Sequence, residues 1–384
     1  MKKTAKVLAI VLAAVMLALC FAGCGKKESD KNTIKIGGIG PLTGDYANYG
    51  TSNNNGAKIA VEEINANGGI AGMQIDLDFQ DSAADPESAV NAYGKLIDNG
   101  MDISLGATFS GETASVVAAA REDNILVLTP TGSADVCIEG NDCAFRVCFK
   151  DSEQGILSAN VIKDYGLPTD VAVFYQSDID YSVGLYESFT AECQNKGINI
   201  VEVQTFTLGT NTDFSTQINA IKDSGVKLVF IPIYAADAST FLTQAQGKLD
   251  EDILYFGCDG LDGILGKVSD PSIAENVMML TPFAADDPAE NVQSFVKKYN
   301  EKYGANPDQF AADGYDAIYV IKAAVEKAGV KPGDPDFDEK VIAAMLEIEV
   351  TGVTGTMTWA ADGNTIKAAK AMIIHDGVAV LYQG

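Results

Sequence analysis

Short apolar runs alternate with amphipathic segments along the first part of the chain. A helix is predicted over 56–67, because Ala57, Ala60, Val61 and Ile64 fall on one helical face. Apolar runs of strand length surround it, at Ile34–Ile39, Ile75–Phe79, Ile103–Leu105 and Ile125–Leu128. This alternation predicts a parallel sheet that is covered by helices on both faces.

The same rhythm starts again after about residue 150. Strands are predicted at Val171–Tyr175, Ile198–Val203, Leu228–Ile233, Ile253–Phe256 and Val277–Thr281. Helices are predicted near 153–165, 182–196, 213–224, 236–248, 288–303, 310–329 and 336–348. The tail has alternating runs that predict a β-meander, at Thr356–Trp359, Ala369–Ile374 and Val378–Leu381. The fold class is therefore α/β, with two doubly wound units and a ligand cleft expected between them, at the carboxyl ends of the strands.

The N-terminus has the plan of a secretory signal peptide over residues 1–23. Three lysines precede an apolar run, Val7–Leu19, which is too short for a membrane span of about 20 residues. Cys24 follows Ala-Gly and resembles the acylated cysteine of a bacterial lipobox, with 24–32 as a tether. Cys20 fits less well, because the preceding residue is not small, and an uncleaved membrane anchor remains the alternative. Either way the body of the protein is expected on the outer face of the bacterial cytoplasmic membrane.

Composition excludes several classes of partner. The 384-residue chain is 47% hydrophobic, which suits a globular protein, and its formal charge of −26 becomes −29 without the signal peptide. Such a surface repels phosphate backbones, so nucleic acid is not an expected partner. After Cys24 no apolar stretch is long enough to cross a membrane, so lipid contact is expected through the N-terminal anchor alone.

Motifs for catalysis, metals or cofactors are not visible. Gly38-Ile39-Gly40 lacks the third glycine of a dinucleotide loop, and Gly263–Lys267 lacks the serine or threonine that follows a phosphate loop. His375 is the only histidine, and no Cys-x-x-Cys pair occurs, so a metal site is not expected. Of the five cysteines in the body, Cys137 and Cys143 could close a small disulfide loop, while the odd count leaves at least one free thiol. We therefore expect neither an enzyme nor a bound cofactor.

Loops that follow predicted strands share small, hydroxyl-bearing and aromatic residues. They lie at Gly106–Gly111, Thr129–Ser133, Asp178–Tyr181, Ile233–Asp237 and Gly257–Gly260. Small residues let a ligand approach the backbone, and hydroxyls and helix amides donate to an anion. Tyr181 and Tyr234 could pack against an apolar group of a ligand, and Asp259 could bind a cation. Taken one at a time these are ordinary turn and cap residues, but together they complement a zwitterionic amino acid.

Several segments together resemble the Leu/Ile/Val-binding proteins of ABC importers. The matching segments are Ile34–Asp45, Tyr49-Gly50, Asn65–Ile70, Asp81–Pro86, Gly314–Ala317 and the Trp359 region. The resemblance runs from about residue 33 to the C-terminus and implies the type I periplasmic binding protein fold, with two lobes and three hinge crossings. It implies a first lobe over 33–150 plus 282–354 and a second over 151–281 plus 355–384.

The resemblance also implies roles for individual residues. Ser110, Thr131 and Ser133 match the family's carboxylate site, and Asp259 matches its ammonium-binding carboxylate, where enteric members usually carry Glu. Tyr181 and Tyr234 match the closing-lobe tyrosines, and Tyr49 matches an aromatic residue at the pocket rim. Ala84 and Phe109 replace two cysteines that form a disulfide in enteric members, and Phe109 is expected to reshape the side-chain pocket.

These observations lead to one expected function with two rivals. We expect a monomeric, lipid-anchored receptor that captures an amino acid, branched-chain aliphatic by resemblance, and hands it to the permease subunits of an ABC importer. One rival is a receptor of the same fold for an amide, urea or an aromatic acid. The other is a sensory co-receptor that signals to a membrane protein.

Overall fold

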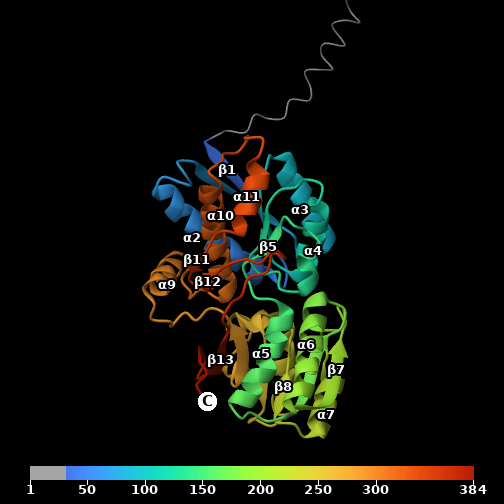
Figure 1. Cartoon of the computed structure of the whole chain (residues 1–384). Helices are drawn as coiled ribbons and strands as arrows, with labels where there is room; N and C mark the ends of the chain where they lie inside the picture. The colour runs from blue at the N-terminus through green and yellow to red at the C-terminus, as the bar shows by residue number, and fades with distance from the viewer. Residues whose placement is uncertain (1–31) are drawn as a thin grey trace, which may run out of the picture.

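The computed structural model describes residues 32–384, which form two α/β lobes stacked end to end (Figure 1). The expected signal peptide, the acylation site Cys24 and nearly all of the tether lie outside the described residues. Within residues 32–384, none of the helices combines the length and the apolarity that crossing a bilayer requires.

The first lobe is a parallel five-stranded sheet with the strand order β2-β1-β3-β4-β5. Its strands are β1 (Thr33–Gly40), β2 (Gln74–Asp81), β3 (Ile103–Ala107), β4 (Val127–Thr129) and β5 (Ala144–Arg146). One face packs against α2 (Ala47–Ala66), α10 (Gln309–Ala328) and α11 (Phe337–Met345). The other face packs against α3 (Pro86–Asp98) and α4 (Ser110–Ala120). The predicted doubly wound arrangement is confirmed, although α2 begins well before the expected residue 56.

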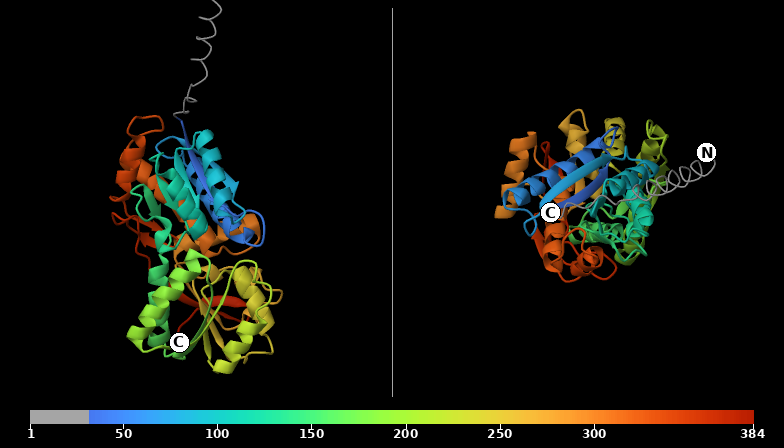
Figure 2. Two further views of the ribbon diagram at one scale, coloured as in Figure 1. Left: turned by 90° about the vertical axis from the view of Figure 1, so that its right-hand side faces the viewer. Right: turned by 90° about the horizontal axis from the view of Figure 1, so that it is seen from above.

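The second lobe has a seven-stranded sheet with the order β14-β13-β10-β9-β8-β6-β7. Its parallel strands are β6 (Asp170–Gln176), β7 (Asn199–Phe206), β8 (Leu228–Phe230), β9 (Leu254–Gly257) and β10 (Val277–Thr281), and its antiparallel strands are β13 (Lys370–His375) and β14 (Val378–Leu381). Helices α5 (Asp151–Asp164) and α6 (Asp180–Lys196) cover one face, and α7 (Ser215–Ser224) and α8 (Ala235–Ala245) cover the other. Figure 2 shows this second layered unit below the first.

The chain crosses between the lobes three times. The crossings lie between β5 and α5, between β10 and α9 (Glu290–Tyr303), and between β12 (Gly355–Met357) and β13. Lys367 lies in the third crossing and is buried, with its ammonium 2.9 Å from Asp313 of α10. Burial raises the pKa of Asp313 to about 7 despite this lysine. This buried ion pair fixes the third crossing to the first lobe.

The C-terminal tail differs from the predicted meander. β12 pairs with β11 (Val350–Gly352) in a separate two-stranded sheet and not with β13. Met357 and Trp359 are buried in the core of the first lobe. Residues 355–359 therefore pack with the first lobe, whereas the expected boundary assigned them to the second. Only β13 and β14 form the antiparallel pair that the pattern predicted.

All five cysteines of the described chain are free, and four of them are buried. The small disulfide loop between Cys137 and Cys143 is therefore not present. Cys137 instead lies under α4, and burial raises the pKa of its thiol to about 12. Its role in this structure is that of a small core residue.

Candidate functional site

The carboxyl ends of the strands in the two sheets face each other across the cleft between the lobes. Ser110 begins α4 directly after β3, and Thr131 and Ser133 follow β4. From the second lobe, Tyr181 begins α6 after β6, Tyr234 precedes α8 after β8, and Asp259 follows β9. The topology thus brings the predicted loops together, as expected for open α/β sheets.

A small cavity of about 190 Å³ lies at the centre of this interface. It is lined by Thr108, Phe109, Thr131, Ser133, Tyr181, Tyr234, Asp259, Gly260 and Phe310. Six of the eight residues expected to contact ligand are in this wall. Thr108, Gly260 and Phe310 were not anticipated individually, although the first two belong to loops that the sequence singled out.

Asp259 is the ionisable carboxylate of the cavity wall. Its side chain is buried and accepts a hydrogen bond of 2.8 Å from the Tyr181 hydroxyl, while its backbone amide donates to Gln154. Burial raises the pKa of Asp259 to about 6, and the hydrogen bonds from Tyr181 and Gln154 oppose that rise. The described lining contains no lysine, arginine or histidine. The cavity therefore offers a buried negative charge without a protein cation to neutralise it.

A second buried carboxylate, Asp151, stands behind this wall. It is completely buried at the start of α5, and Gln154 donates to its Oδ1 at 3.3 Å. None of the described residues donates to its Oδ2. Burial, followed by repulsion from Asp259, raises the pKa of Asp151 well above its usual value. No motif in the sequence distinguished Asp151 from other acidic residues in so acidic a chain.

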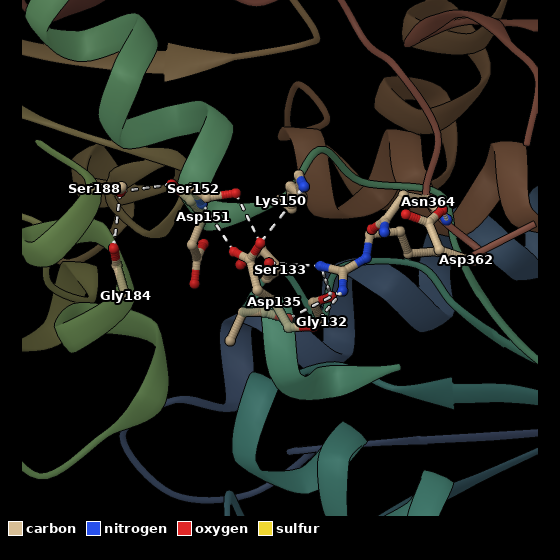
Figure 3. Close-up of polar contacts among 12 residues, drawn as sticks. Gly132, Ser133, Asp135, Lys150, Asp151, Ser152, Gly184, Ser188, Asp362 and Asn364 are labelled. Atoms are coloured by element: carbon tan, nitrogen blue, oxygen red, sulfur yellow. Dashed lines mark hydrogen bonds and ion pairs between the residues drawn. The ribbon is translucent and has the colours of Figure 1, made fainter. Parts of the chain in front are cut away.

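The loop that carries Ser133 is held by a buried arginine, Arg146. Its guanidinium donates to the carbonyl oxygens of residues 132–135 at 2.6–3.3 Å. On the other side of the loop, Asp135 accepts from the amide and hydroxyl of Ser152 at 3.0 and 2.7 Å (Figure 3). The Ser133 carbonyl also accepts from the Asp151 amide at 3.0 Å. These contacts position the loop between β4 and the first hinge crossing.

Tyr49 lies outside the cavity lining and links the two lobes. Its side chain is fully buried; the hydroxyl donates to the Gly260 carbonyl at 2.6 Å and accepts from the Ala235 amide at 2.7 Å. Nearby, Tyr46 of the first lobe donates to Asp237 of the second at 2.9 Å. The lobes are therefore closed on each other, and Tyr49, which was expected at the pocket rim, is a closing contact.

Ser110 also lies apart from the inner cavity. It lines a larger outer groove of about 1160 Å³, together with Tyr46, Asp178, Asp180 and Leu208. The Ser110 hydroxyl accepts from the Ala134 amide at 3.1 Å, which leaves its proton available to an acceptor. Phe109 and Tyr234 belong to the walls of both the groove and the cavity. Ser110 thus lines the groove, while its hydroxyl contacts the loop that carries Ser133 through the Ala134 amide.

Comparison with known proteins identifies the family to which the chain belongs. A family model described as "Periplasmic binding protein" matches residues 33–377. The chain belongs to this periplasmic binding protein family. The resemblance found in the sequence is thereby confirmed, and members of the family are extracytoplasmic solute receptors.

Characterised relatives carry names that refer to aliphatic amino acids. The leucine-, isoleucine-, valine-, threonine- and alanine-binding protein of Pseudomonas aeruginosa is 26% identical, over 90% of this chain and 91% of that protein. The Leu/Ile/Val-binding protein BraC3 of Rhizobium johnstonii is 29% identical, over 86% and 88% of the two chains. Among solved structures, LivJ of Streptococcus pneumoniae in complex with isoleucine is 28% identical, with a TM-score of 0.82 and coverage of 90% and 97%. This periplasmic binding protein is thus similar to receptors whose names refer to branched-chain amino acids.

Proposed function

We propose that this protein captures an aliphatic α-amino acid between its lobes and delivers it to an ABC importer, with branched-chain residues as the expected class. The observation that carries the proposal is the buried, uncompensated carboxylate of Asp259 in the wall of the central cavity. A ligand ammonium would supply the missing positive charge and restore the ionised form of Asp259. The names of the relatives support the same ligand class.

The carboxylate of the ligand has a separate set of donors. Ser133 lies in the cavity wall together with Asp259, and Ser110 begins α4, an eleven-residue helix whose N-terminus faces the cleft. Helix N-terminal amides and serine hydroxyls favour a negative charge. Thr131 contributes differently, because its hydroxyl donates to the Thr108 carbonyl at 2.8 Å and accepts from Asn53 at 3.0 Å. We propose that Thr131 shapes this end of the site and that Ser133 and Ser110 bind the carboxylate.

Delivery follows from closure of the lobes and from the expected anchor. A ligand held by groups from both lobes stabilises the closed state in proportion to its preference for that state. Acylation at Cys24 would keep the receptor beside the permease, and a monomer suffices for this role. No chemical conversion of the ligand is part of the proposal.

The aromatic wall favours one alternative ligand class. Phe109, Tyr181, Tyr234 and Phe310 all face the cavity, which suits the ring of an aromatic acid. An aromatic acid without an ammonium group, however, would leave Asp259 buried and unpaired. We therefore rank this class second, and the ligand panel below includes it.

The proposal is tested with the chain lacking residues 1–23, titrated calorimetrically with the twenty L-amino acids, benzoate, urea and acetamide. We expect micromolar or tighter binding of at least one aliphatic amino acid. At 100 times its dissociation constant, the ligand should add about 2.7 kcal/mol to the free energy of unfolding. Binding of benzoate or an amide without binding of any amino acid would contradict the proposal.

The affinity is expected to depend on pH through Asp259. The ligand ammonium pairs with the ionised carboxylate, so below a pKa of about 6 binding must first remove a proton. The association constant should therefore fall by up to about tenfold for each pH unit below 6 and level off above 7. Calorimetry from pH 8 to pH 4.5, in buffers of different ionisation enthalpy, measures both the affinity and the proton release.

The stability of the ligand-free protein should depend on pH in the opposite direction. Because the folded pKa of Asp259 lies above the usual value of 3.8, the folded state binds this proton more tightly than the unfolded chain. The contribution of Asp259 to stability is present at low pH and is lost as pH rises through about 6. The increase in Tm that the ligand causes should accordingly be larger at pH 7.5 than at pH 5, and an equal increase at both would contradict the assignment.

A further inference from the structure

Two aromatic rings, one from each lobe, separate the central cavity from the outer groove. The ring centroids of Phe109 and Tyr234 lie 4.5 Å apart, and both residues belong to the walls of both spaces. Asp259 and Ser133 line only the inner space, whereas Leu208 and Asp178 line only the outer one. An amino acid held by Asp259 and Ser133 would therefore extend its side chain toward this pair of rings.

Phe109 is held in place by its backbone and by its neighbours. Its amide donates to the buried Glu112 carboxylate at 3.3 Å, and its carbonyl accepts from Thr113 at 2.8 Å. Its ring is mostly buried and packs edge-on against Tyr49 at 5.1 Å and Tyr46 at 5.8 Å. Retraction of the ring from the cavity would lose its packing against Tyr49 and Tyr46.

Tyr234 is held from the side of the second lobe. Its ring stacks on Tyr181 with centroids 4.7 Å apart and an interplanar angle of 9°, and it also meets Tyr49 at 5.5 Å. Tyr181 is itself held by hydrogen bonds to Asp259 and from the Gly260 amide, each 2.8 Å long. A ligand that displaced Tyr234 would thus disturb the carboxylate that binds its own ammonium group.

The space inside the pair is small. The empty space of about 190 Å³ at the cavity consists largely of narrow gaps between lining atoms, whereas the groove beyond the rings has about 1160 Å³, part of it open to solvent. As the lobes are closed here, only about one water molecule fits within the cavity. Each added side-chain carbon must therefore push the rings aside or hold the lobes further apart.

We infer that Phe109 sets an upper limit to the size of the ligand side chain, so that the protein prefers alanine, serine, threonine and valine to leucine, isoleucine and phenylalanine. This inference rests on the proposed amino-acid function and shifts the expected ligands from the branched-chain class to small side chains, among which valine is the one branched-chain residue. A single methylene changes binding by about 10- to 200-fold when a pocket is closely fitted. The preference should therefore amount to at least tenfold between valine and leucine.

The test compares Kd values for these seven amino acids in three proteins. In the wild type the four small ligands should bind at least tenfold more tightly than the three large ones. Phe109→Ala joins the cavity to the groove, so leucine, isoleucine and phenylalanine should bind at least tenfold more tightly than they do to the wild type, and the ratio of the Kd for leucine to the Kd for alanine should fall at least tenfold. Leu208→Ala is the matched control, because this side chain lines only the groove and is 68% exposed, and it should leave the order unchanged.

Each outcome decides the inference. If Phe109→Ala does not fold, Phe109→Leu should shift the order in the same direction by a smaller factor. Wild-type protein that binds leucine or isoleucine as tightly as alanine, or an order that neither Phe109 variant changes, would overturn the size limit and leave the proposed function standing. Absence of binding by every amino acid would instead overturn the proposed function, and the size limit with it.

Discussion

Replacement of Asp259 with alanine is expected to weaken amino-acid binding by at least about 100-fold at pH 7.5. The ligand ammonium would then enter a buried space without its counter-ion, and truncation of one partner of a buried charged pair costs about 2–5 kcal/mol. Asp259→Asn preserves the shape and an acceptor for the Tyr181 hydroxyl, yet lacks the charge, so its affinity should fall nearly as far. Calorimetry with the tightest ligand of the panel measures both losses.

Folding should survive these substitutions. In the free protein the ionised Asp259 carboxylate is buried without a cation, so its removal takes away a cost. The Tm of the free Asp259→Asn variant should therefore match or exceed that of the wild type at pH 7.5. Asp180→Ala is the matched control, because this carboxylate is exposed in the outer groove, and its Kd should stay within twofold of the wild type. Unchanged affinity in Asp259→Ala would show that the ammonium binds elsewhere.

The parallel strands were predictable because each is buried on both faces. Such strands are nearly continuous apolar runs, and β1, β3 and β10 all appear as such in the sequence. β5 was missed, since it has only three residues and ends in Arg146. Which strands pair with each other was harder to predict from the sequence. The run at β12 was recognised, but its pairing with β11 depends on packing around Trp359 that no local pattern encodes.

The part of the candidate site that could be predicted consists of residues in loops directly after strands. Ser133, Tyr181, Tyr234 and Asp259 were identified from that position and from family resemblance, and the fold brings them to one cavity. The residues that tune and support the cavity were not found. Asp151, Gln154 and Arg146 act through burial and through partners far along the chain, such as the 105-residue separation between Gln154 and Asp259. Neither property is visible in a single sequence.

Arg146 carries the largest expected effect on stability. Arg146→Met keeps most of the side-chain length but removes every donor to the carbonyl oxygens of residues 132–135. Each buried acceptor left without a partner costs about 1–3 kcal/mol, and part of this is recovered when the loop relaxes toward water. We expect a loss of about 3–5 kcal/mol in the free energy of unfolding, and hence a decrease in Tm of roughly 4–7 °C for a chain of this length. Thermal unfolding by circular dichroism measures it.

The same substitution should weaken ligand binding, because Ser133 depends on this loop for its position. A tenfold or greater increase in Kd is expected at 10 °C, where the variant remains folded. Arg121→Met is the matched control: this arginine is exposed and makes one long contact of 3.4 Å with the Glu139 carbonyl, so stability should change by less than about 0.5 kcal/mol. Arg146→Lys should recover only part of both losses, since one ammonium cannot reach four carbonyls arranged around a planar guanidinium. If Arg146→Met lost stability but bound ligand with wild-type affinity, the loop would be a core element with no part in placing Ser133.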